Sequence, residues 1–144
     1  MTDDRKQSTD QPVEQGADKE RKVARQAVPL LHFDLAKEVE QLRQEDAWLK
    51  AGHLAKTLVK RADFRIVLFV LKAGTRIEEH KTDASISIQA LRGRLLLHLP
   101  EREVDLLAGH LLALDRAVPH AVEAVEESAF LLSISRSQAA ESDS

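Results

Sequence analysis

Two stretches decide the fold of this chain: GTRIEEHKTDASISIQALRG at residues 74–93 and GHLLALDRAVPHAVEA at residues 109–124. Both contain runs in which apolar and polar side chains alternate, and this period of two is typical of β-strands with one buried face. Each stretch also contributes a histidine at the entry to a strand, His80 in the first and His120 in the second. We therefore expect two pairs of strands, with His80 in the first pair and His120 in the second.

The strand pattern continues through most of the chain after residue 54. Together with the strands inside the two quoted stretches, the predicted strands are 54–61, 64–72, 85–91, 94–99, 102–107, 110–115, 120–125 and 129–135. No helical pattern separates them, so the sheets should be antiparallel, and many short strands of this kind predict a sandwich or a jelly-roll β-barrel. The run FRIVLFVL at 64–71 is apolar on both faces, so its outer face needs a cover from a helix or a second subunit.

One short helix is predicted ahead of the strands, over about 34–46. Asp34 has the character of an N-cap, and Leu35, Val39 and Leu42 fall on one face of the helix. Trp48 is interpreted as a packing anchor between this helix and the barrel. The predicted organisation is a disordered charged tail over 1–27, a barrel with its N-terminal helix over 28–135, and a second disordered tail over 136–144.

The composition argues against several classes of function. A net charge of −3 and an aromatic content of 3% give neither the basic surface nor the stacking platforms that nucleic-acid binding needs. The chain has no cysteine, which excludes disulfides, cysteine metal sites and thiol nucleophiles. No leader or membrane-spanning run is present, so we expect a cytoplasmic protein with no nucleic-acid or membrane partner.

The first stretch resembles the first conserved motif of the cupin family. Gly74, His80, Thr82, Ile86 and Gly93 stand at the spacing at which the family has glycine, two histidines, glutamate and glycine. The identities therefore agree at both glycines and at the first histidine.

The second stretch is similar to the second cupin motif. Gly109, Asp115, Ala117, His120 and Ala124 stand where the family has glycine, proline, glycine, histidine and asparagine. The resemblance extends over about residues 48–135 and implies a small single-domain cupin of the cupin-2 type, an all-β jelly-roll barrel behind a short N-terminal helix.

The resemblance also implies a degenerate metal site. Cupins with metal chemistry hold one divalent ion through three histidines and a glutamate, and only His80 and His120 are retained here. Thr82 offers a weak neutral hydroxyl and Ile86 offers no ligand, whereas catalytic zinc and iron sites usually rest on three protein ligands. A dication without a carboxylate in an apolar cavity is costly, so a divalent metal cofactor is conceivable but not favoured.

One alternative restores the carboxylate. Side chains alternate along an extended segment, so Glu78, His80 and Thr82 should point to the same side. Glu78, His80 and His120 would then form a two-histidine-one-carboxylate metal site. On this alternative the protein is a metal-dependent oxygenase or isomerase.

The favoured hypothesis is a small-molecule-binding protein, a homodimer, without a tightly bound metal. Its pocket has apolar walls and two imidazoles as polar handles, which suits a small, mostly apolar ligand with one acceptor or acid group. The expected lining residues are His80, Thr82, Ile86, Ile88, His120 and Val122. No pair of nucleophile and base stands out, so no catalytic residue is assigned and an enzymatic activity stays open.

The remaining polar residues have weaker support for a role. His98 is expected to point out of the barrel, and Glu123, Glu126 and Glu127 are interpreted as a solvated rim. A third hypothesis, a regulatory or interaction protein, rests only on the charged N-terminal tail.

Overall fold

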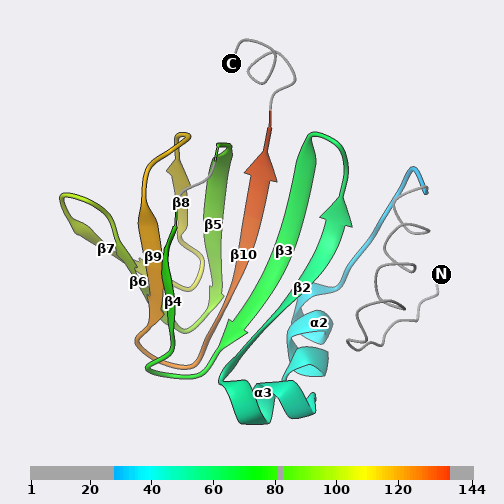
Figure 1. Cartoon of the computed structure of the whole chain (residues 1–144). Coiled ribbons are helices and arrows are strands. Elements are labelled where there is room, and N and C mark those ends of the chain that lie inside the picture. The colour runs from blue at the N-terminus through cyan, green and yellow to red at the C-terminus, as the bar shows by residue number, and fades with distance from the viewer. Residues whose placement is uncertain (1–27, 81–82, 137–144) are drawn as a thin grey trace. The chain divides into compact units, whose positions relative to one another are not determined.

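The computed structural model describes residues 28–80 and 83–136, so the tails predicted for 1–27 and beyond Arg136 lie outside the described residues. The chain divides into two units at residues 33 and 34, and all the helices and strands among the described residues belong to the second unit. In chain order its elements are α2 (Leu35–Leu42), α3 (Asp46–Ala51), β2 (His53–Lys60), β3 (Phe64–Leu71), β4 (Arg76–His80), β5 (Ser85–Arg92), β6 (Arg94–His98), β7 (Glu103–Leu107), β8 (Leu111–Leu114), β9 (His120–Ala124) and β10 (Ser128–Ser135) (Figure 1).

The strands form two antiparallel sheets, as the alternating pattern predicted. One sheet has the order β2-β3-β10-β5-β8 and the other has the order β4-β9-β6-β7 (Figure 1). Strands distant in sequence pair in both sheets: β10 lies between β3 and β5, and β9 lies between β4 and β6. Within residues 28–80 and 83–136 the fold is therefore all-β apart from two short helices.

The interior between the sheets is apolar and follows from the alternation within β5. Ile86, Ile88 and Ala90 are buried, whereas Ser85 and Gln89 between them are exposed. The buried cluster draws on both sheets and comprises Leu71, Ile86, Ile88, Ala90, Leu95, Leu97, Leu106, Val122, Ala124 and Phe130. Burying one face of each sheet against the other is the main source of stability in such a fold.

The outer face of β3 is covered by the helices. The sequence predicted that either a helix or a second subunit would cover this face. Leu68 and Val70 alternate with the core-facing residues of β3 and are fully buried, and Val39 of α2 and Trp48 of α3 are also buried. Lys72 places its ammonium group 5.5 Å from the centre of the Trp48 ring. Trp48 is thus buried between the helical segment and the sheet, as interpreted from the sequence.

The single helix predicted over 34–46 is wrong, because the segment forms two helices. Asp34 does cap α2, accepting a hydrogen bond from the backbone N–H of Lys37 at 3.2 Å. The first helix ends at Leu42, and Glu45 in extended conformation is the N-cap of α3. Glu45 and its neighbours tolerate helix, so the apolar pattern could not show this break.

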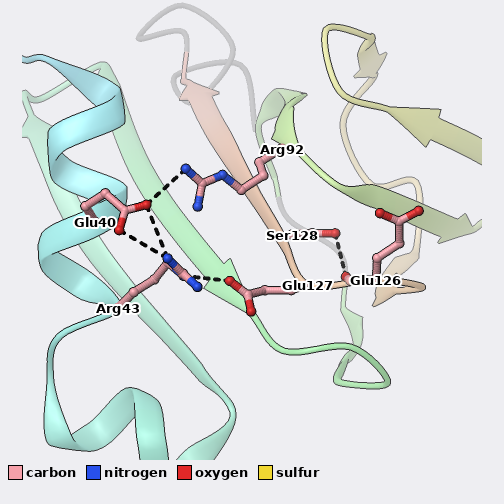
Figure 2. A network of polar contacts seen from close by, with 6 residues as sticks. All are labelled: Glu40, Arg43, Arg92, Glu126, Glu127 and Ser128. Carbon is pink, nitrogen blue, oxygen red and sulfur yellow. Dashed lines mark hydrogen bonds and ion pairs between the residues drawn. The ribbon is translucent and has the colours of Figure 1, made fainter.

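Ion pairs attach α2 to the ends of β5 and β10 (Figure 2). Glu40 contacts Arg92 at 3.0 Å and Arg43 at 3.1 Å, and Arg43 Nε lies 2.6 Å from a carboxylate oxygen of Glu127. The hydrogen bond from Arg92 lowers the pKa of Glu40, and the bond to Glu127 raises the pKa of Arg43. Glu127, expected to be merely solvated, therefore helps to hold the helix on the barrel.

The turn at Gly93 packs against the start of β10. Gly93 has a φ of +80°, and a Cβ added there would collide with the carbonyl oxygen of Glu127 and the hydroxyl of Ser128. The buried Ser128 hydroxyl accepts from the Arg94 N–H at 3.0 Å and lies 2.8 Å from the Glu126 carbonyl oxygen, a contact drawn in Figure 2. Only glycine allows the two segments to approach so closely.

Candidate functional site

The pairing of β4 with β9 brings the two motif histidines to the same place in the sheet. His80 and His120 are direct partners in the register of these strands, although they are far apart in the sequence. The side chain of His80, and Thr82 as a whole, lie outside what the structure describes. The sequence prediction that the two histidine positions meet is consistent with this register.

His120 is enclosed by the fold. Its exposed fraction is 2%, and it is the only buried histidine among those whose side chains are described. It stands two residues before Val122 and so on the same face of β9, the face that belongs to the buried cluster. Its Nδ1 lies 3.0 Å from the carbonyl oxygen of Val118.

The predicted wall residues lie together in the interior. Ile86 and Ile88 of one sheet and Val122 of the other belong to the same buried cluster, with exposed fractions of 5%, 1% and 3%. Other apolar residues packed against this cluster are only partly buried, namely Phe69, Ile77, Val104, Leu112, Leu114, Leu132 and Ile134. The interior is therefore made of apolar side chains, mostly aliphatic, and the partly buried ones reach solvent.

Glu78 lies on the outside of its strand. Its side chain is 81% exposed and lies 3.6 Å from Arg76 Nε. The register of β4 on β9 shifts between Ile77 and His80, and such an irregularity breaks the simple alternation on which the prediction for Glu78 relied. Its exposure therefore counts against Glu78 as a metal ligand.

A resident metal does not fit the described donors. No three histidine, aspartate or glutamate side chains described by the structure are placed to hold an ion together. Ile86, at the glutamate position of the resembling motif, is buried and apolar. A dication beside this wall would lack the negative charge that offsets its desolvation.

The turn before β9 contains a feature that sequence reasoning missed. Ala117 has a φ of 65°, in the left-handed region that glycine adopts easily and alanine rarely. The signal was present, because Ala117 stands at a glycine position of the second motif. Its consequence could not be foreseen: the next carbonyl, that of Val118, is the partner of His120.

His98 lies on the opposite face of the four-stranded sheet, as predicted. Leu97 beside it is fully buried, while the His98 ring contacts Glu123 at 2.8 Å and Glu103 at 2.9 Å. These contacts connect β6 with both of its neighbours. Glu123, expected in the solvated rim, is instead a partner of His98.

A second pair on the same sheet is Arg94 with Asp105. Arg94 Nε and one of its terminal nitrogens each lie 2.8 Å from an oxygen of the Asp105 carboxylate. The hydrogen bond from Arg94 lowers the pKa of Asp105. This face is therefore charged and internally paired, in contrast to the apolar interior.

No protein-family model matches the chain, and no curated protein matches its sequence. Neither helix in the described part of the chain has the length and apolar character needed to cross a membrane.

Solved structures do match, and several are described as cupins. A conserved protein of unknown function from Streptococcus pyogenes is 26% identical with a TM-score of 0.58, covering 62% of this chain and 78% of its own. A cupin-2 domain protein from Shewanella frigidimarina is 15% identical with a TM-score of 0.59, covering 72% and 94%. Salicylate 1,2-dioxygenase from Pseudoaminobacter salicylatoxidans is 18% identical with a TM-score of 0.61; 78% of this chain matches 35% of that enzyme.

Proposed function

The chain has the fold of a small cupin, and from this premise we propose that it binds a small molecule inside the barrel, at a pocket centred on His80 and His120. One observation carries the proposal: His120 is 2% exposed on the face of β9 that belongs to the apolar cluster. In an otherwise apolar interior, a buried imidazole is the kind of polar group that fixes the orientation of a bound ligand. The register of β4 on β9, in which His80 is the partner of His120, supports His80 as the second polar group of the pocket.

The ligand class follows from the lining. Ile86, Ile88 and Val122 offer aliphatic surface and no charge, so the favoured ligand is small and mostly apolar. A single polar group on the ligand would meet the imidazoles. Leu132 and Ile134 of β10 pack against the same buried cluster and are only partly buried. Their exposure supports a route by which the ligand enters the interior beside this part of β10.

The test is a thermal-shift series with small aromatic and short-chain acids, alcohols and phenols. Salicylate is the first probe, because one structural neighbour is named for it and because it joins a ring to an acid and a hydroxyl. A ligand that binds only the folded state raises the melting temperature with concentration. We expect the shift to vanish in His120→Ala and to persist in His110→Ala, a matched control at an exposed histidine.

Two results would contradict the proposal. The first is the absence of stabilisation by every probe at concentrations that saturate weak sites. The second is an equal shift in wild type and in a folded His120→Ala variant, which would place binding elsewhere. Circular dichroism of each variant separates loss of binding from loss of fold.

A second candidate is a metal-dependent oxygenase or isomerase using Glu78, His80 and His120. The structural likeness to a dioxygenase favours it, although the exposure of Glu78 does not. Elemental analysis of protein purified without chelator decides between the two candidates. One tightly held ion per chain would support the enzyme, and metal-free protein that binds salicylate would exclude it.

We further propose that the protein is a homodimer. The support is general: the strands of both sheets carry apolar side chains on their outer faces, such as Leu111 of β8 and Leu107 of β7, which are 64% and 44% exposed. Light scattering after size-exclusion chromatography measures the mass directly. A monomeric mass at micromolar protein concentration would contradict the homodimer. It would leave the proposal of a small-molecule pocket unaffected.

A further inference from the structure

The hydrogen bond of His120 determines which of its nitrogens carries a proton. Nδ1 lies 3.0 Å from the carbonyl oxygen of Val118, and a carbonyl oxygen has no proton to give. Nδ1 must therefore be the donor. In the neutral ring, Nε2 then carries the lone pair and can only accept.

We infer that His120 is locked in the Nδ1-protonated form, so that the molecule bound in the barrel must meet it with a hydrogen-bond donor: a phenol, an alcohol or an undissociated acid. This inference rests on the proposed function and narrows its ligand class. It does not depend on which group meets Nε2 before the ligand arrives. Any such group, from the chain or from a ligand, has to donate.

The backbone around Val118 keeps its carbonyl group in place. Ala117 is in the left-handed conformation with a φ of 65°. Val118 precedes a proline, which restricts Val118 to extended conformations, and the ring of Pro119 fixes the φ of Pro119 itself. Three consecutive residues are thus restricted immediately before His120, and we assign Pro119 as a positioning residue for the imidazole.

This tautomer gives a preference between ligands that share the same ring and differ in whether their oxygen can donate a hydrogen bond. A donor at Nε2 completes a hydrogen bond, whereas an ether oxygen there would bring two lone pairs together in a buried place. An unmade buried hydrogen bond lowers affinity on the order of tenfold. Phenol should therefore bind on the order of tenfold more tightly than anisole, which has the same ring and a methyl ether in place of the hydroxyl.

The first experiment observes the tautomer without any ligand. Long-range proton–nitrogen NMR spectra of the uniformly nitrogen-15-labelled chain distinguish protonated from unprotonated ring nitrogens. We expect a protonated Nδ1 and an unprotonated Nε2 for His120 at neutral pH. A protonated Nε2 with a bare Nδ1, or a ring protonated on both nitrogens, would overturn the inference whether or not any ligand is found.

The role of Pro119 is tested by the same spectra. In Pro119→Ala the carbonyl of Val118 is less restricted, so the signals should move toward a mixture of both tautomers. Pro100→Ala, in the turn between β6 and β7, is the matched control and should leave the His120 signals unchanged. Identical spectra for wild type and Pro119→Ala would refute the positioning role.

The ligand preference is measured by titrating phenol and anisole separately into the full chain. The inference predicts that phenol binds more tightly and that the difference disappears in His120→Phe. Equal binding of both compounds to wild type refutes the donor requirement while leaving the pocket intact. If neither compound nor any other probe of the thermal-shift series binds, the proposed function is refuted, and the tautomer measurement still decides whether Nδ1 of His120 carries the proton.

Discussion

Replacing Gly93 by alanine is the sharpest test of how the two sheets are joined. A Cβ at this position would lie 2.9 Å from Ser128 Cα and even closer to the Glu127 carbonyl oxygen and the Ser128 hydroxyl. Two of these three atoms are backbone atoms, so no side-chain rotation relieves the overlap. The start of β10 would have to move away from the turn between β5 and β6.

The expected cost has two parts. Holding a non-glycine residue at a φ of +80° costs about 1–2 kcal/mol. Forcing the backbone apart adds about 1–3 kcal/mol, the usual range for overpacking. The sum, about 2–5 kcal/mol, is a large part of the stability of a small domain.

Gly109→Ala is the matched control. Its φ is +91°, but a Cβ there would have no heavy atom within 4 Å, so only the conformational part should appear. Urea denaturation followed by the fluorescence of buried Trp48, the single tryptophan, gives both free energies of unfolding. Equal losses for Gly93→Ala and Gly109→Ala would refute the close approach at Gly93.

Three further substitutions test the polar contacts by the same denaturation assay. Ser128→Ala should cost about 1–3 kcal/mol, because the Arg94 N–H loses its acceptor; no loss would mean that another acceptor replaces it. Burial raises the pKa of Glu45, so the ionised carboxylate lowers the free energy of unfolding at neutral pH. Glu45→Gln should therefore be more stable than wild type at neutral pH. This gain in stability should disappear in acid, where Glu45 is protonated. The hydrogen bond from Arg92 lowers the pKa of Glu40, so its contribution is present at neutral pH and is lost as the pH falls: Glu40→Gln should be less stable only above the acid range. A pH-independent effect would contradict either assignment.

Much of the fold could be predicted from alternation alone. The serine–isoleucine alternation of residues 85–88 identified the buried face of β5, and the same reasoning placed His120 and Val122 on one face of β9. These assignments held because burial of one face of a sheet fixes the register of its strands. The jelly-roll fold itself rested on the two motifs and is confirmed by structural neighbours described as cupins.

Other features depended on contacts that no local pattern reveals. The strand Arg76–His80 was treated only as an extended segment, since a short charged run has a weak signal, and its register shift could not be read from composition. For the same reason Glu78 was expected to share the side of His80. The partners of Glu127 and Glu123 come from distant elements, so both carboxylates looked merely solvated in the sequence.

The most direct test of the pocket follows the histidine ring signals by NMR while salicylate is added. If the two motif histidines are the polar groups of one binding site, the signals of His80 and His120 shift together. Both titration curves then give the same dissociation constant for salicylate. The signals of the exposed His53 and His110 should stay in place. Saturable binding that moves neither His80 nor His120 would contradict a site at these two residues.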